Sequence, residues 1–217
     1  MRASVWLTTF VGVGLLVLAR PARRLPAAQP TTEDDGLGPV TERVYWQDVS
    51  GLAQSPSALV SEVLGHFPAL MPRPLAFTRK VSGQPGMGRP GDRFFLLLFG
   101  MRRAWVEVES VSAGAFRNRT LRHNPDAGWV SFSAEERDDG VVRLKVHSRV
   151  RSSTWLDRLT YLAGVRYLQR LTWETLLRRA ARLGGGHALA WGHQTAEYSA
   201  GRREGAAAPA DQVTSGA

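Results

Sequence analysis

The feature that most constrains this chain is a long amphipathic segment, Thr154 to Leu183, that follows a series of strand-like runs. About seven such runs lie between Thr41 and Ser152, and most of them alternate apolar and polar residues. Such alternation is typical of antiparallel strands with one buried face. One helix closing over one curved antiparallel sheet encloses space, so this order predicts an α+β domain with an internal cavity.

Local signals support individual elements. Val142, Leu144 and Val146 alternate with charged residues, which predicts a half-buried strand. Ser55-Pro56 places proline in the first turn of a short helix. Thr154 to Asp157 resembles a capping box at the start of the long helix. The residues expected on the apolar stripe of that helix are Trp155, Leu159, Leu162, Val165, Leu168, Leu171, Leu176, Ala180 and Leu183.

Composition divides the chain into four parts. Residues 1–24 form a hydrophobic segment, 25–39 a proline-containing linker, 40–186 the folded domain, and 187–217 a flexible tail rich in glycine and alanine near its end. For His187 to Ser199, which contains Trp191 and Tyr198, packing on the domain is the alternative. The uncharged run Ala3–Ala19 would be about 25 Å long as a helix at ~1.5 Å per residue, against a hydrocarbon core of about 30 Å.

We therefore expect an N-terminal hydrophobic helix that anchors the chain in a membrane. A cleaved signal segment, which would give a secreted protein, and a wrongly assigned start codon are the alternatives. Positive charge after the run, at Arg20, Arg23 and Arg24, exceeds that before it by one charge. This excess favours a cytoplasmic position for the main domain.

Cysteine is absent, which excludes disulfides, cysteine-bound zinc and a thiol nucleophile. The net charge is +9 and comes almost entirely from arginine, since lysine occurs only at Lys80 and Lys145. A basic surface favours anionic partners such as phospholipid headgroups. The arginines are spread over strands and the last helix without a recognised motif, so nucleic-acid binding is not expected.

Candidate chemistry is sparse. The five histidines do not have the spacing of metal ligands, so neither a metal nor a cofactor is expected. Glu107 and Glu109 share one strand face, where pairing with arginine is the expected role and acid–base catalysis the alternative. The loop Gly83–Gly91 lacks the ending of a phosphate-binding loop. No residue is predicted to be catalytic.

The element order resembles the helix-grip fold of the START and Bet v allergen-like superfamily, also called SRPBCC, over Glu42 to Leu183. Within it, Thr120 to Gly128 is similar to a motif of a bacterial and plant family of unknown function, Thr-Leu followed by Gly-His-Pro-Glu-x-Gly. Asp126 replaces the glutamate, and Asn124 replaces the histidine, with His123 one place earlier. The resemblance implies a curved seven-stranded sheet wrapped around a C-terminal helix, with an apolar cavity between them.

We expect this cavity to bind a hydrophobic or amphipathic small molecule, with the domain held at a membrane through Ala3–Ala19. A cyclase- or hydratase-like enzyme using the same cavity, and a packed interaction domain without a ligand, are the alternatives. The sequence indicates neither a particular ligand nor an oligomeric state. His123 is the one candidate polar group, and the predicted lining residues, which would otherwise simply fill the core, are Trp105, Trp129, Phe132, Trp155, Leu159, Leu162 and Trp173.

Overall fold

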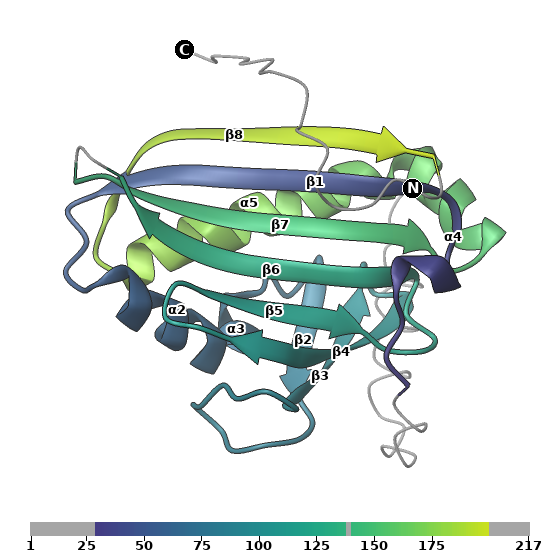
Figure 1. Cartoon of the computed structure of the whole chain (residues 1–217), viewed down its shortest axis with the longest axis horizontal. Helices are drawn as coiled ribbons and strands as arrows, with labels where there is room; N and C mark the ends of the chain where they lie inside the picture. Colours follow the sequence, from purple (N-terminus) through teal and green to yellow (C-terminus); the bar gives the residue numbers. More distant parts are fainter. Residues whose placement is uncertain (1–28, 138–139, 200–217) are drawn as a thin grey trace, which may run out of the picture.

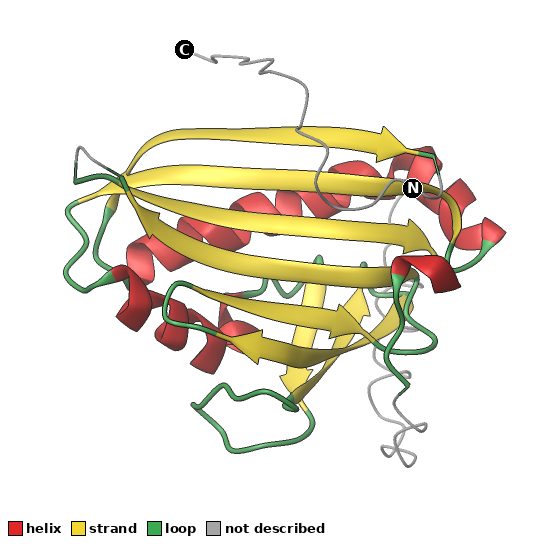
Figure 2. Ribbon diagram, viewed as in Figure 1, coloured by secondary structure: helices red, strands yellow, loops and turns green. Residues whose placement is uncertain are grey.

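A single antiparallel sheet forms the body of the molecule (Figures 1 and 2). The computed structural model describes residues 29–137 and 140–199. The strand order is β2-β3-β4-β5-β6-β7-β1-β8, so the first strand lies between two strands from the C-terminal half. The strands are β1 (Leu37–Ser50), β2 (Ala76–Lys80), β3 (Arg93–Leu98), β4 (Arg102–Val111), β5 (Ala115–Thr120), β6 (Asp126–Glu136), β7 (Val142–Ser152) and β8 (His187–Tyr198).

The helices gather on one face of this sheet. The longest, α5 (Arg166–Leu183), crosses behind the long strands in Figure 1, with α2 (Pro56–Gly65) and α3 (Phe67–Leu70) beside its C-terminal half. A short 3-10 helix, η1 (Glu33–Asp35), precedes β1. The sheet gripping a C-terminal helix confirms the predicted α+β helix-grip arrangement.

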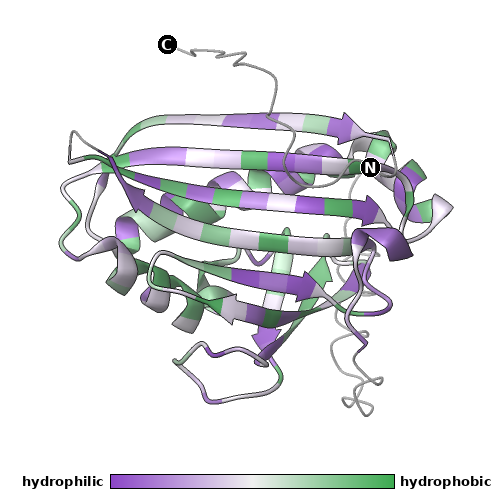
Figure 3. Ribbon diagram, viewed as in Figure 1, coloured by the Kyte–Doolittle hydropathy of each residue, from purple (hydrophilic) through white to green (hydrophobic). Residues whose placement is uncertain are grey.

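The local signals that predicted these elements are confirmed. The Ser55 hydroxyl accepts a hydrogen bond of 3.3 Å from the Ala58 N–H at the start of α2. The Thr154 hydroxyl accepts one of 3.2 Å from the Asp157 N–H at the next helix start. Alternation along β7 appears as green and purple bands in Figure 3, and Val142, Leu144 and Val146 are buried.

The sheet has eight strands, not seven, because part of the predicted flexible tail is β8. This strand pairs with β1 from Ser50↔His187 to Val40↔Tyr198. Most side chains of β8 are exposed or half-buried, so the strand is held mainly by its backbone hydrogen bonds to β1. Its sequence therefore lacks the alternating apolar residues that reveal a core strand. The linker prediction also ends too late, since η1 and the first residues of β1 lie within residues 25–39.

The last helix is broken. The helix α4 (Trp155–Thr160) passes through a π-helical turn, η2 (Tyr161–Val165), into α5. Gly164 has φ 133° and ψ −10° in that turn, a conformation that other residues rarely adopt. The predicted apolar stripe is exposed on both sides of the break, at Trp155 (66%) and Leu159 (61%) before it and at Leu168 (37%) and Leu171 (44%) after it. Only its last part, with Leu176 and Ala180, is buried against the sheet.

The hydrophobic core occupies one end of the space between sheet and helices. The second half of α5 packs there with α2, and large side chains from the strands fill the remainder. Phe67 meets Phe94 and Phe116 edge to face, with ring centroids 5.3 and 6.2 Å apart, and Phe116 stacks on Phe132 at 5.6 Å. The interior is therefore tightly filled at this end.

The expected N-terminal hydrophobic helix, Ala3–Ala19, lies outside the described residues. Within residues 29–137 and 140–199, no helix has both the length and the apolar character needed to cross a bilayer. The anchor therefore stays a prediction.

Candidate functional site: a cavity between the sheet and α5

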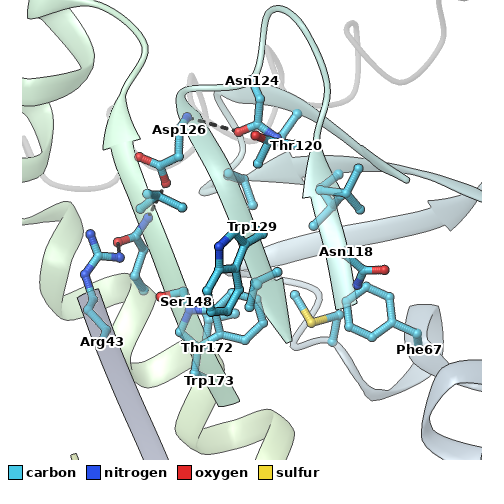
Figure 4. Close-up of a pocket in the computed structure, with 18 of the residues that line it drawn as sticks. Arg43, Phe67, Asn118, Thr120, Asn124, Asp126, Trp129, Ser148, Thr172 and Trp173 are labelled. Carbon is cyan, nitrogen blue, oxygen red and sulfur yellow. Dashed lines mark hydrogen bonds between the residues drawn. The ribbon is translucent and has the colours of Figure 1, made fainter. Parts of the chain in front are cut away.

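A cavity of about 80 Å³ lies between the sheet and the first half of α5 (Figure 4). Its walls come from β1, β3 to β7, α3, α5 and the segment joining β5 to β6. The lining residues are mostly apolar, and Arg43 and Asp126 are its two ionisable members among the residues the structure describes. The cavity is therefore an apolar chamber with a local polar wall.

Side-chain size explains why this end is hollow. At the filled end, adjacent strands contribute Phe116, Phe132 and Val146, which pair across β5, β6 and β7. At the cavity end, the strands contribute small residues such as Ala104 and Ser148. Where such small side chains face α5, part of the space between the sheet and the helix is left unfilled.

A hydrogen-bonded chain crosses the cavity wall from β1 to β6. Arg43 on β1 donates from Nη1 to Oε1 of Gln169 on α5, at 2.7 Å. Gln169 in turn donates from Nε2 to Oδ2 of Asp126, at 3.0 Å. The guanidinium carbon of Arg43 also lies 4.7 Å from the centre of the Tyr161 ring. The amide thus separates a buried cation from a carboxylate, and an aromatic ring covers one face of the cation.

The turn before β6 places Asp126 on this wall. Asn124 accepts a hydrogen bond from the Asp126 N–H on Oδ1, at 3.1 Å, and donates from Nδ2 to the Trp105 carbonyl, at 3.0 Å. The Thr120 hydroxyl accepts from the Gly128 N–H at 2.8 Å. The segment that carries the family resemblance therefore builds one corner of the cavity, with Asn124 holding the turn and Asp126 at the wall.

The surroundings of Asp126 favour its protonated form. Burial raises the pKa of its carboxyl group, and this effect outweighs the opposing influence of the Arg43 charge and the Gln169 hydrogen bond. A carboxyl group with a raised pKa in an apolar chamber can exchange a proton with a bound molecule.

The structure places two of the predicted lining residues at the cavity, Trp129 and Trp173. The ring of Trp129 packs against His147, with centroids 4.9 Å apart, and beneath the Arg117 guanidinium, so it lies toward the outer face of the sheet. Trp173 enters from α5.

The other predicted lining residues are corrected. Phe132 is part of the filled core, and Trp105 contacts Phe95 with centroids 5.2 Å apart. Trp155, Leu159 and Leu162 lie on α4 and η2, before the break at Gly164, and are 66%, 61% and 49% exposed.

His123 is exposed and has a φ of 70°, so it occupies the tip of the turn and its neighbour Asn124 is the buried residue. Sequence reasoning missed Arg43 because a charged residue in an antiparallel strand is ordinarily expected on the solvent face. The buried Thr41, Tyr45 and Val49 show that the odd-numbered residues, Arg43 among them, face inward.

The carboxylate of Glu107 lies on the outer face of the sheet, away from the cavity. It accepts hydrogen bonds from Arg93 at 2.8 Å and from Arg119 at 2.8 Å, so it has the expected structural role in an ion-pair network. Burial alone would raise its pKa, but the hydrogen bonds from Arg119 and Arg93 hold that pKa below its ordinary value. Among the described residues, no group of three or more His, Asp or Glu side chains is arranged to hold a metal ion.

Comparisons with known proteins concern the fold. No family model matches the chain, and no curated protein matches it. A hypothetical protein from Helicobacter pylori has a TM-score of 0.49 and 14% identity, covering 65% of this chain and 86% of its own. A START superfamily protein from Mycobacterium smegmatis has a TM-score of 0.46 and 14% identity, covering 67% and 99%. The aromatase/cyclase StfQ of the steffimycin biosynthetic pathway has a TM-score of 0.48 and 14% identity, covering 70% and 52%.

One of these structures carries the superfamily name that the sequence resemblance suggested. At such identities the likeness assigns neither a ligand nor an activity to this chain. The helix-grip description therefore rests on the observed strand order and on the helix that the sheet surrounds.

Proposed function

We propose that this protein binds a hydrophobic or amphipathic small molecule in the cavity between the sheet and α5. The observation that carries the proposal is a chamber left hollow by small, buried side chains in an otherwise filled interior. Transfer of an apolar ligand into such a chamber is favoured by ~25 cal/mol for each Å² of apolar area removed from water.

The size of the cavity limits the ligand. Its volume of about 80 Å³ is well below the roughly 300–1,000 Å³ of typical drug-sized pockets. A compact ring or short chain fits this description better than a whole lipid. A larger molecule would have to displace lining side chains such as Trp173.

The test is ligand capture by the full chain. Native mass spectrometry and solvent extraction of the purified protein should recover a small apolar molecule, and propylbenzene should bind as a model ligand in calorimetry. Ala104→Leu fills the cavity from β4 and should abolish propylbenzene binding without lowering the melting temperature. Ala163→Leu, on the exposed π turn, is the matched control. Failure of propylbenzene to bind, with no molecule recovered, would refute the proposal.

A second candidate is a cyclase- or hydratase-like enzyme that uses the same cavity. Asp126 is the specific observation in its favour, since a carboxyl group with a raised pKa lies on the cavity wall beside a buried arginine. In such an enzyme Asp126 would be the group that exchanges a proton with the substrate. Ligand binding that persists in Asp126→Asn, together with unchanged recovered molecules, favours the binding function over this one.

We also propose that the domain binds to the surface of a membrane. Its supporting observation is a set of exposed apolar side chains on α4, η2 and the start of α5. We call this set the α4 face, and it comprises Trp155, Leu156, Leu159, Leu162, Tyr167, Leu168 and Leu171. Between Thr154 and Leu171 the chain carries three arginines, Arg158, Arg166 and Arg170, and one carboxylate, Asp157, so this stretch has a positive charge that favours anionic lipids.

Charge favours a bilayer over a second copy of the chain as the partner of the α4 face. A two-fold interface would bring the same arginines of two copies together, at an electrostatic cost. Arg166, which lies against the Tyr167 ring at 4.8 Å, illustrates this positive fringe.

Vesicle flotation of the full chain tests this proposal. Vesicles of equimolar phosphatidylglycerol and phosphatidylcholine should bind more strongly than phosphatidylcholine alone, and salt should weaken the difference. The double variant Leu156→Ser with Leu159→Ser should reduce binding about tenfold, because two apolar side chains leave the bilayer. Met87→Ser, at an exposed apolar residue on the loop between β2 and β3, is the control. Unchanged flotation of the double variant, or a dimer that it disrupts, would overturn the proposal.

A further inference from the structure

Three polar side chains share one row across the inner face of the sheet. Asn118 on β5 is paired with Val130 on β6, Val130 with Ser148 on β7, and Ser148 with Arg43 on β1. Figure 4 shows Arg43, Ser148 and Asn118 lying across the cavity in this order. All four residues of the row line the cavity. The row is thus a polar band, interrupted by one valine, on an apolar wall.

Each of the three polar side chains has an atom without a hydrogen-bond partner in the described part of the chain. These atoms are Arg43 Nε, Ser148 Oγ and Asn118 Oδ1. The residues are only 5%, 4% and 2% exposed. More than about 90% of buried polar groups in native proteins are hydrogen-bonded, because an unpaired one costs roughly 1–3 kcal/mol. Three on one wall of one cavity point to a bound partner.

The three atoms differ in what they can bind. Arg43 Nε only donates a hydrogen bond, Asn118 Oδ1 only accepts one, and the Ser148 hydroxyl does either. Nη1 of Arg43 is already engaged by Gln169, and the Tyr161 ring covers one face of the guanidinium. The Nε–H group of Arg43 is therefore a buried donor that still lacks an acceptor.

Strand spacing sets the distance between these groups. Neighbouring strands lie about 5 Å apart, so Ser148 and Arg43 are adjacent, while Asn118 is about 10 Å from Ser148 with Val130 between them. One end of the row therefore donates hydrogen bonds, the other accepts, and the middle is apolar.

We propose that this row binds both ends of a compact amphipathic ligand, a ring compound with a carbonyl or carboxylate at Arg43 and Ser148 and a hydroxyl at Asn118. This proposal rests on ligand binding in the cavity, as proposed above, and adds the chemical class of the ligand. The apolar body of the ligand lies over Val130 and against Trp173. A hydroxyl group that donates to Asn118 and a carbonyl group that accepts from Arg43 satisfy the unpaired atoms at the two ends.

Calorimetric titration of the full chain with four related probes tests the assignment. The first, para-hydroxyphenylpropanoic acid, carries both polar ends, a hydroxyl and a carboxylate. Phenylpropanoic acid carries only the carboxylate, para-propylphenol only the hydroxyl, and propylbenzene neither. Para-hydroxyphenylpropanoic acid should bind most tightly. Loss of its hydroxyl or of its carboxylate should weaken binding about tenfold, since a buried polar group of the protein is then left unpaired.

Variants assign each end to its residue. In Asn118→Leu, probes with the hydroxyl should bind no more tightly than probes without it, while the carboxylate should still strengthen binding. In Arg43→Met, the carboxylate should no longer strengthen binding, while the hydroxyl still should. Gln47→Met is the matched control, because Gln47 is buried on the same face of β1 but does not line the cavity. Melting temperatures show that each variant is folded.

The outcomes separate this inference from the proposed function. If all four probes bind equally, the apolar cavity is a binding site and the polar row is not a recognition element, which overturns the inference alone. If propylbenzene and the polar probes all fail to bind, the binding function itself is refuted. If Asn118→Leu and Arg43→Met each weaken every probe equally, the residues support the fold and the assignment of ends is wrong.

Discussion

Asp126 and Arg43 are the two ionisable side chains on the wall of the cavity, among the residues described, and neither touches the other directly. Gln169 joins them by accepting from the cation and donating to the carboxylate. A direct ion pair would hold the carboxylate charged, whereas the intervening amide leaves burial as the stronger influence. The cavity therefore holds a fixed positive charge beside a carboxyl group that readily keeps its proton.

The raised pKa of Asp126 predicts how stability depends on pH. Its favourable contribution is fully present below the unfolded-state pKa of about 3.9 and is lost as pH rises through the higher folded-state value. The free energy of unfolding of Asp126→Asn should therefore increase relative to the parent across that interval, and then level off. Urea unfolding at several pH values measures this, with the exposed Asp34→Asn as the charge control. A difference that falls with rising pH would contradict the assignment.

Among the elements, the break between α4 and α5 has the largest consequences. Asp157 at the start of α4 forms an ion pair with Arg102 on β4, and Arg158 pairs with Glu197 on β8 at 3.1 Å. These contacts fix α4 to the rim of the sheet while α5 follows another direction from Gly164 onward. The break is what lets one helical segment both line the cavity and present apolar residues outward.

Replacing Gly164 tests this break. Gly164→Ala should lower the free energy of unfolding by about 1–2 kcal/mol, because alanine is strained at φ 133° although no atom lies within 4 Å of its Cβ. Thermal unfolding should show a melting temperature several degrees lower. Gly114→Ala is the control, since its Cβ would make an ordinary contact of 3.6 Å at a glycine that is not in the left-handed region. Equal stability of the two variants would show that the turn tolerates a side chain.

Local patterns predicted most elements because their causes are local. The alternation from Val142 to Val150 gave β7, and Thr154 and Asp157 gave the helix start. The orientation of the first part of the last helix could not be predicted from its apolar residues, since the side that faces the sheet in the first half of α5 carries Gln169 and Thr172, whereas Leu168 and Leu171 are exposed. The polar row was also hidden, because placing Asn118 beside Ser148 and Arg43 requires the register of four strands.

At the scale of the whole molecule, the interior is divided into a filled end and a hollow end. The filled end joins α2, α3 and the second half of α5 to the sheet. At the hollow end, residues 29–31 bond to the end of β5 through the Thr31 N–H and the Arg122 N–H. Pro125 of the turn before β6 also accepts from the Ser153 N–H, just before α4. The cavity corner, α4 and the point where the described chain begins therefore lie near one another.

The edge strand β8 and the central strand β7 should differ in how readily their backbone hydrogen bonds open. The edge strand β8 pairs with β1 alone, and most of its side chains are at least partly exposed, whereas β7 lies between β6 and β1 with alternate residues buried. Hydrogen exchange monitored by mass spectrometry should therefore show amides of β8 exchanging at least about tenfold faster than those of β7. Equal protection of the two strands would mean that β8 opens only when the whole domain unfolds.

The position of β1 in the sheet also has a consequence for the newly made chain. Its partners are β7 and β8, so Thr41 must find Val150, and Val40 must find Tyr198, across most of the domain. During synthesis β1 emerges first and finds its partners last, and such distant pairings slow folding. Until β7 has left the ribosome, both edges of β1 are unpaired, and this strand is then open to chaperones and to association with other chains.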